Sequence, residues 1–347
     1  MNSTSNLPLI SIIIPNYNGS RYLENCLKSL RSQTYGRTEI VVVDNDSEDE
    51  SITIARSVAP EATVLVQNQN LGFAGGVNAG IRFSRGDWIA VLNNDTEATP
   101  EWLSECVRAI QDHPDASFLA CRILSLADRN RIYSAGDCFF RAGIGYRRGQ
   151  EQKDHEEFRQ ECEIFSASGC AGLYRREVLN SAEGFDERFF AYLEDVDLGL
   201  RLQAKGCRGY YVPAAKIYHR GAGTSGGEFS PLAVRLRTRN SLLLLLKSLP
   251  GTIFLRCLPM IIFAQLSWLL RVIVHQQLMN YMKGLVNTFS LAPAMIKERP
   301  KMHPYWRSSG GQLWRRILQS ESLVRKEIKS VPAERVSLFL KWYFRLF

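Results

Sequence analysis

LISIIIPNYNG, residues 9–19, carries the pattern that decides the fold class of this chain. An almost unbroken apolar run, Leu9–Ile14, ends at once in Pro15, and a second run, Ile40–Val43, ends in Asp44. Runs rich in Ile and Val and bounded by turn residues are typical of strands buried on both faces of a sheet. Similar runs follow at Thr63–Val66, Trp88–Leu92 and Ser117–Cys121.

Segments with helical periodicity separate these runs and carry helix start signals. Ser47–Glu50 reads as a capping box, and Thr99–Glu101 offers a cap, a first-turn proline and an acid. Strands that alternate with helices predict an α/β fold with a Rossmann-like, doubly wound and mainly parallel sheet. Ligands of such sheets bind beyond the carboxyl ends of the strands, so we expect the chemistry just after Ile14, Val43 and Leu92.

The charge distribution divides the chain near residue 230. Residues 231–347 carry 19 Lys and Arg against 4 Asp and Glu, a balance of +15, whereas residues 1–230 carry a balance of −7. A basic region of this strength suits anionic lipid head groups or nucleic acid, and the acidic front suits an enzyme that recruits a divalent cation. Residues 242–246 and 253–274 are strongly apolar, which favours a membrane over nucleic acid as the partner of this region.

The apolar segment 253–274 is interrupted by charge. Arg256 and Arg271 leave 14 residues between them, fewer than the ~20 that a spanning helix needs. We therefore expect a helix that lies in the interface of an anionic membrane. A true span, a buried core helix and a homodimer face are the alternatives.

Targeting and cysteine signals point to the cytosol. The N-terminal apolar run is preceded by no basic segment, so it reads as a strand and not as a signal peptide. The eight cysteines are scattered and form no C-x-x-C pair, which indicates reduced thiols.

Three loops at the expected strand ends carry candidate ligand-binding residues. Asp44 can accept the imide N–H of a pyrimidine base, and the glycine-rich loop Asn70–Asn78 can bring backbone N–H groups to a phosphate. Asp95 can hold a divalent ion against a diphosphate leaving group. The structural alternatives are a helix cap at Asp44, tight helix–sheet packing at the glycines, and a turn at Asp95.

Gly184–Leu198 is the most informative single stretch. Glu194 and Asp195 follow the aromatic segment Phe189–Tyr192 at the start of a helix that we expect to end before Gly206. A carboxylate beside aromatic rings can remove the proton of a sugar hydroxyl, although acids at a helix start are also stabilised by the helix dipole alone. Further on, His219 precedes a Gly-rich segment and is either structural or a metal ligand.

Taken together and in this order, these segments resemble the family-2 inverting glycosyltransferases of the A-type fold, in the bacterial rhamnosyltransferase-like branch. The resemblance covers roughly residues 9–250. The matching pieces are Ser11–Gly19, Val42–Ser47, Asn70–Gly76, Leu92–Asp95, Gly184–Glu187, Glu194–Leu202 and Tyr218–His219.

The resemblance implies a role for each of these loops. Asp44 would contact the donor base, Asp95 would bind Mg²⁺ or Mn²⁺ with help from His219, and Asp195 would be the general base with Glu194 in support. The family's metal motif is often Asp-x-Asp, and here its first position is Asn93. The donor-binding set would be Pro15, Tyr17, Asn18, Asp44, Asn70, Gly72, Phe73 and Asn94.

The implied enzyme moves a sugar from a nucleotide-diphosphate donor, with rhamnose from dTDP-rhamnose as first choice, to a glycan or polyprenyl-linked acceptor in cell-surface polysaccharide synthesis. Residues 1–230 would form the catalytic domain, with nucleotide-sugar binding at 9–121 and the acceptor side at 122–230. Residues 231–347 would form a basic helical region at the cytoplasmic face of the membrane. Another sugar-nucleotide enzyme and a catalytically inactive scaffold are the alternatives, and the absence of G-x-G-x-x-G argues against a dehydrogenase.

Overall fold

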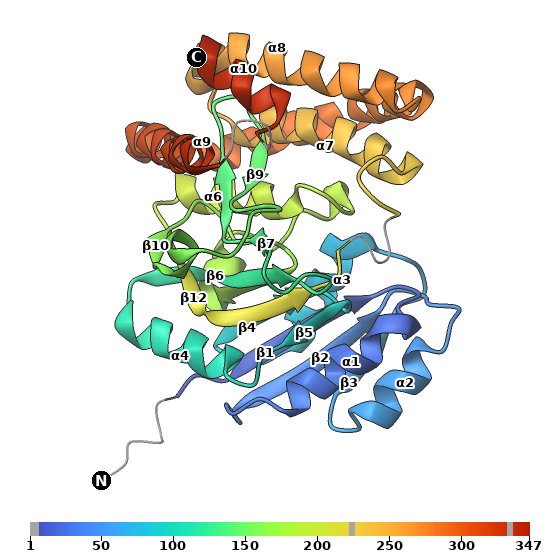
Figure 1. The fold of residues 1–347 in the computed structure, drawn as a ribbon. Helices are drawn as coiled ribbons and strands as arrows, with labels where there is room; N and C mark the ends of the chain where they lie inside the picture. The colour runs from blue at the N-terminus through green and yellow to red at the C-terminus, as the bar shows by residue number, and fades with distance from the viewer. Residues whose placement is uncertain (1–6, 222–225, 332–335) are drawn as a thin grey trace.

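The computed structural model describes residues 7–221, 226–331 and 336–347 (Figure 1). Part of the Gly-rich segment after His219, residues 222–225, lies outside the described residues. The sheet lies at one end of the molecule, and the C-terminal helices form a layer at the other end (Figure 1).

A single large sheet forms the centre of the fold, in the strand order β10-β12-β6-β11-β4-β1-β2-β3. The first four strands are parallel, as predicted: β1 (Ile10–Asn16), β2 (Thr38–Asp44), β3 (Thr63–Val66) and β4 (Trp88–Leu92). The second half of the sheet contains β6 (Ala116–Ser125), β10 (Cys162–Glu163), β11 (Ala171–Arg175) and β12 (Arg208–His219). Strand β11 is antiparallel to β4 and β6, so its first residues lie at the edge where the parallel strands end.

Short strands extend this edge. Strand β5 (Thr96–Ala98) pairs with the end of β12, and β7 (Ile132–Ser134) pairs with β6. A separate hairpin, β8 (Asp137–Phe139) with β9 (Gly145–Arg147), rises from the sheet toward the C-terminal helices (Figure 1).

Helices cover both faces of the sheet, and each face has its own apolar cluster. One cluster contains side chains of α1 (Ser20–Arg31), α2 (Ser51–Val58) and α4 (Trp102–Asp112). The other contains side chains of α3 (Gly72–Phe83), α5 (Arg176–Ser181) and α6 (Glu194–Ala204). Two 3-10 turns lie at Glu156–Arg159 and Glu187–Phe189.

Both predicted helix caps are wrong. Helix α2 begins at Ser51, because the Ser47 hydroxyl instead accepts the N–H of Asn18 from the neighbouring strand end at 2.9 Å. Helix α4 begins at Trp102, and the Thr99 hydroxyl donates to the carbonyl of Lys216 on β12. In both cases the side chain that the sequence pattern assigned to a helix cap makes a hydrogen bond to the backbone of a residue far along the chain.

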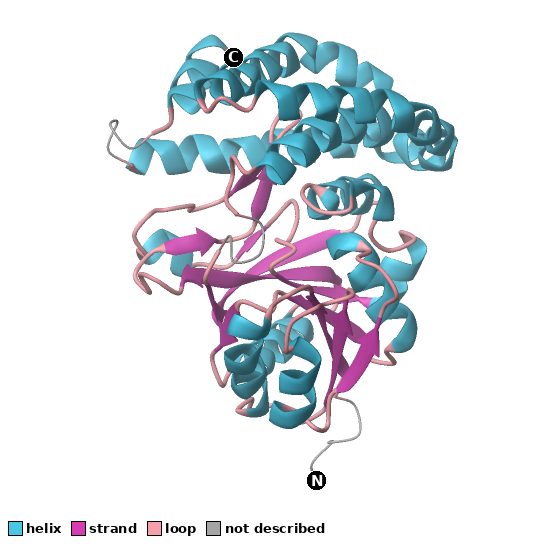
Figure 2. Cartoon of the chain, turned by 90° about the vertical axis from the view of Figure 1, so that its right-hand side faces the viewer, coloured by secondary structure: helices cyan, strands magenta, loops and turns pink. Residues whose placement is uncertain are grey.

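The C-terminal region is helical, as predicted, and forms a third layer that both views show as separate from the sheet (Figure 2). It consists of α7 (Pro231–Ser248), α8 (Gly251–Val274), α9 (Leu278–Ser330) and α10 (Leu338–Leu346). An apolar cluster joins α6 to α7, α8 and α9, so this layer packs against the helix that begins with Glu194. A second cluster joins the β8–β9 hairpin to α8, α9 and α10.

Candidate functional site

The ends of β1, β2 and β4 are joined by side-chain hydrogen bonds. Asn94 donates to Asn16 Oδ1 at 2.6 Å, and Asn16 donates to Asp44 Oδ1 at 3.0 Å. The other Asp44 oxygen accepts the N–H of Ser47 at 3.0 Å. Asn94, Asn16 and Asp44 are all buried. Asp44 and Asn94, both predicted to bind the nucleotide-sugar donor, are therefore joined through Asn16 in one fixed unit beneath the surface.

Three of the predicted donor-binding residues lie in the last part of β1 or just after it. Pro15 is partly exposed, whereas Tyr17 and Asn18 are exposed at the strand end. The next residue, Gly19, is held so close that an added Cβ would lie 2.1 Å from Asn94 Nδ2. Only glycine allows this approach.

Asp95 and His219 form a buried pair. His219 Nε2 lies 3.0 Å from Asp95 Oδ1, because the antiparallel pairing of β5 with β12 sets His219 opposite Thr96. The amide of Asn93 lies 3.4 Å from the same imidazole nitrogen, and the ring of Tyr133 packs edge-on against His219 at 4.3 Å.

This pair suits a divalent cation. Its two donor atoms are a carboxylate oxygen and an imidazole nitrogen, a set that suits Mn²⁺ when other oxygens complete the shell. Within the described parts of the chain, His, Cys, Asp and Glu side chains nowhere gather in a group of three or more that could hold a metal. The remaining ligands would therefore come from the bound diphosphate and from water.

The glycine-rich loop opens α3, as predicted. Asn70 Oδ1 accepts the N–H of Gly72 at 2.8 Å, and Gly72 adopts a φ of +70°. A Cβ at Gly72 would lie 2.5 Å from the carbonyl oxygen of Phe190, and the same oxygen accepts the N–H of Ala74. Close packing against the segment before Glu194 thus accounts for glycine at this position.

Asp195 lies at the same strand edge as the Asp95–His219 pair. Its Oδ2 accepts the N–H of Gly169 at 2.9 Å, and the next residue, Cys170, accepts the N–H of Asn93 through its carbonyl. Phe73 borders the same point, since a Cβ at Gly169 would lie 3.2 Å from its ring and 3.5 Å from Asp195 Oδ2. Gly169 and Cys170, just before β11, therefore connect the candidate base to the candidate metal motif.

Electrostatics favour proton binding at Asp195. Burial of its carboxyl raises the pKa of Asp195, while the N–H groups of Gly169 and Val196 and the charge of Arg147 oppose the rise. A carboxylate with a raised pKa is a stronger base, as proton abstraction requires.

Glu194 is different from its neighbour. It is buried, and its Oε2 accepts and donates no hydrogen bond. Burial and the adjacent Asp195 charge raise the pKa of Glu194 well above its usual range. The neutral form of Glu194 is therefore favoured.

The segment Phe189–Leu193, which leads into Asp195, has an unusual backbone. Phe190, Tyr192 and Leu193 all have φ between 64° and 68°, a region costly for residues with a side chain. Asn240 of α7 offsets this cost, because its amide donates to the carbonyls of Phe189, Ala191 and Tyr192 at 2.7–2.9 Å.

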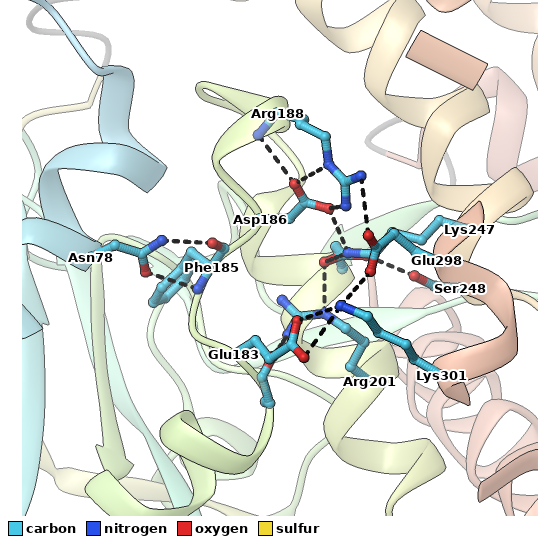
Figure 3. A network of polar contacts seen from close by, with 12 residues as sticks. Asn78, Glu183, Phe185, Asp186, Arg188, Arg201, Lys247, Ser248, Glu298 and Lys301 are labelled. Carbon is cyan, nitrogen blue, oxygen red and sulfur yellow. Dashed lines mark hydrogen bonds and ion pairs between the residues drawn. The ribbon is translucent and has the colours of Figure 1, made fainter. Parts of the chain in front are cut away.

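Further polar residues of α7 hold the region around the start of α6 (Figure 3). Lys247 Nζ lies 2.7 Å from Asp186 and 2.9 Å from Asp197, and Ser248 donates to Asp197 at 2.6 Å. Burial opposes the ionisation of Asp197, but Arg201 and Lys247 lower its pKa below the usual value. A buried group of paired charges therefore fixes the first turn of α6, which carries Asp195.

The geometry agrees with a family comparison that covers just under half of the chain. Residues 11–182 match the family model described as glycosyl transferase family 2. Residues 11–182 form a glycosyltransferase family 2 domain.

Among relatives of this glycosyltransferase is the N-acetylglucosaminyl-diphospho-decaprenol L-rhamnosyltransferase of Mycobacterium tuberculosis, 29% identical over 64% of the chain and 78% of the relative. The O-antigen biosynthesis protein RfbC of Myxococcus xanthus is 28% identical over 65% of the chain, which spans only 18% of that relative's length. Among solved structures, the mannosyltransferase PcManGT of Pyrobaculum calidifontis, in complex with GDP-Man and Mn²⁺, has a TM-score of 0.51 at 16% identity, over 90% of this chain and 87% of that one. This likeness confirms the A-type glycosyltransferase fold.

Sequence patterns missed several residues of this candidate site. Asn16, although inside the first motif, was not assigned, and its central position between Asp44 and Asn94 appears only in the structure. Gly169 lies in a region without clear periodicity. Asn240 and Lys247 belong to the basic region beyond residue 230, about 50 residues from their partners, where no local signal indicates contact with the site.

Proposed function

We propose that this glycosyltransferase moves a sugar from a nucleotide-diphosphate donor to a hydroxyl of a glycan or polyprenyl-linked acceptor, with inversion. The observation that carries the proposal is the connection of Asp195 to the Asp95–His219 pair through Gly169, Cys170 and Asn93. Through these contacts, the residues just before β11 join the proposed base, Asp195, to the candidate diphosphate site at Asp95 and His219.

In this mechanism Asp195 accepts the proton of the acceptor hydroxyl, which attacks the anomeric carbon from the face opposite the nucleotide. The N–H of Gly169 orients the Asp195 carboxylate, and the raised pKa suits it to take the proton. Tyr17, Asn18 and the buried Asn94–Asn16–Asp44 unit would hold the nucleoside, with Phe73 beside the sugar.

Asp95 and His219 would hold Mg²⁺ or Mn²⁺. A bound divalent ion neutralises the charge that develops on the leaving diphosphate. Support comes from the oxygen and nitrogen donors of the pair and from the fold relative, whose complex contains Mn²⁺.

Rhamnose, from dTDP-rhamnose, is the proposed sugar, and cell-surface polysaccharide synthesis is the proposed context. The support is the Mycobacterium relative, which is named for rhamnosyl transfer to a lipid diphosphate, and the Myxococcus relative, which is named for O-antigen biosynthesis.

We further propose that the C-terminal layer attaches peripherally to the cytoplasmic face of the cell membrane. Helix α8 exposes Leu255, Ile262, Leu266, Leu270 and Ile273, whose spacing forms one continuous stripe. No acidic residue occurs between Glu228 and Glu298, whereas basic residues recur there. By length and composition α8 alone, among the helices that the structure describes, also reaches what a membrane span needs.

The test of the transferase proposal is a panel of nucleotide sugars with purified full-length protein, measuring donor hydrolysis and transfer. We expect dTDP-rhamnose to be used, and Asp195→Asn to abolish turnover while donor binding stays within a few-fold, since the amide keeps the shape but cannot take a proton. Near wild-type turnover in Asp195→Asn would remove this residue from the role of base.

A further inference from the structure

Arg147 has a place in the site that neither the motifs nor the proposed mechanism uses. It ends strand β9, directly opposite Asp137 in the β8–β9 hairpin. Its guanidinium stacks on the face of Tyr133 at 4.3 Å from the ring centre, and the same ring packs edge-on against His219 at 4.3 Å. Arg147 is therefore separated from the candidate metal ligand by a single aromatic ring.

Arg147 is also close to the candidate base. Its charge acts on both Asp195 and Asp137, opposing the rise that burial causes in the pKa of each carboxyl. The guanidinium is therefore within electrostatic range of Asp195, and one aromatic ring, that of Tyr133, separates it from His219.

The hydrogen-bonding edge of Arg147 is unused. Across the ranges that the structure describes, its side chain makes no ion pair and no hydrogen bond. Nearby arginines are engaged, since Arg148 donates to the carbonyls of Ala135 and Glu157, and Arg188 binds Asp186 with two nitrogens. A partly buried guanidinium that is stacked on a ring, with its fork open, is arranged to receive a planar pair of oxyanion oxygens.

The backbone on both sides of Arg147 is anchored. Tyr146 donates to Glu327 of α9 at 2.9 Å, and the N–H of Gly149 donates to the same carboxylate at 3.1 Å. The hairpin is also fixed at Phe139, whose N–H donates to Ser320 at 2.8 Å. Arg147 is therefore held in position before any ligand binds, which lowers the entropic cost of binding.

We propose that Arg147 binds a diphosphate through a two-pronged guanidinium contact, either the diphosphate of the nucleotide donor or that of a lipid-linked acceptor. The proposal rests on the proposed transferase function. It adds a protein cation to a site whose metal motif has Asn93 in place of an acid.

Binding measurements with two probes separate the two sources. Calorimetry of the full-length protein with dTDP in chelator reports on the donor diphosphate without metal, and farnesyl diphosphate reports on a lipid diphosphate. Charge-assisted bonds of this kind correspond to about 1.5–3 kcal/mol, so Arg147→Gln should weaken the relevant probe roughly 10- to 150-fold. Arg147→Lys should recover only part of the affinity, because it keeps the charge but loses the fork.

Arg129→Gln is the matched control. Arg129 stacks on Tyr218 at the same 4.3 Å, but its charge is already paired with Glu97. Loss of dTDP binding in Arg147→Gln alone assigns the donor diphosphate, and loss of farnesyl diphosphate alone assigns the acceptor. Unchanged binding of both probes, even with a lower kcat, overturns the proposal and leaves Arg147 as a counter-charge for the carboxylates. If the wild-type protein transfers sugar, unchanged probe binding in Arg147→Gln contradicts only the role of Arg147, and the proposed function stands. A wild-type protein that binds neither probe would contradict the proposed function itself.

Discussion

Asp137 is a buried acid with a like charge close by. Its Oδ1 accepts the hydroxyl of Ser134 at 2.9 Å, and burial, followed by the charge of Asp195, raises its pKa to about 7, against the opposing charge of Arg147. Asp137 binds its proton more tightly in the folded protein than in the unfolded chain, where its pKa is near 4. The folded protein therefore loses stability as pH rises from about 4 to about 7.

Asp137→Asn should therefore raise Tm at pH 8 and change it little near pH 4, where the wild-type carboxyl is already neutral. The amide keeps the acceptor for Ser134, so no hydrogen bond is lost at that atom. Thermal unfolding at both pH values measures this, with the exposed Asp128→Asn as control. Equal effects at the two pH values would show that Asp137 ionises normally.

Asp95 is expected to act through the ion it holds. Asp95→Ala should weaken nucleotide-diphosphate binding in Mg²⁺ or Mn²⁺ and change it little in chelator, because only the metal-dependent part of the affinity is removed. Calorimetric titration with dTDP under the two conditions measures the difference. Equal losses in both would mean that Asp95 has only a structural role.

At the scale of elements, strands were more predictable than the contacts between loops. The runs at β1, β2 and β4 are nearly continuous because both faces are covered, and this pattern is readable in the residues themselves. The roles of Ser47 and Thr99 could not be predicted in this way, because their hydroxyls bond to Asn18 and Lys216, far along the chain, and cap no helix.

The order of the second half of the sheet is set by long-range pairing, which local periodicity does not encode. Strand β11 inserts antiparallel between β4 and β6, and this brings Gly169 to Asp195. The Asp195 motif itself was readable from sequence, but the burial that raises the pKa of its carboxyl was not.

Helix α7 should matter to turnover through Asn240. In Asn240→Asp a carboxylate replaces the amide that donates to three carbonyls of the segment before Asp195, and each buried group left unpaired costs roughly 1–3 kcal/mol. We expect kcat to fall at least about tenfold, equivalent to about 1.4 kcal/mol, with a smaller change in donor KM.

Steady-state kinetics with the preferred donor measures this, and Asn287→Asp on α9 is the control. Unchanged kcat in a folded Asn240→Asp variant would show that the unusual backbone of Phe189–Leu193 does not depend on α7.

At the scale of the whole molecule, the apolar stripe of α8 and the basic C-terminal region should act together on a membrane. Each basic residue near an anionic surface contributes about 1 kcal/mol, and apolar burial adds about 25 cal/mol per Å². We expect binding to anionic vesicles that weakens in neutral vesicles and in high salt.

Co-sedimentation with vesicles measures the affinity, and washing of cell membranes with high salt and alkaline carbonate measures the mode of attachment. Leu266→Glu with Leu270→Glu should release the protein, whereas Phe83→Glu, at an exposed apolar residue of α3, should not. Resistance to both washes would favour a membrane span by α8, and a protein that binds no membrane would direct the stripe to a homodimer.

The contacts of α9 also set the order in which the enzyme matures during its synthesis. Arg141, in the turn of the β8–β9 hairpin, binds Glu321 through its side chain and backbone, 180 residues further along the chain. At 5–20 residues per second, translation needs roughly 9–36 s to cover that distance. The parallel sheet can form during this interval, but the hairpin that carries Arg147 is not anchored until α9 has been made, so the nascent chain completes the candidate site only after α9.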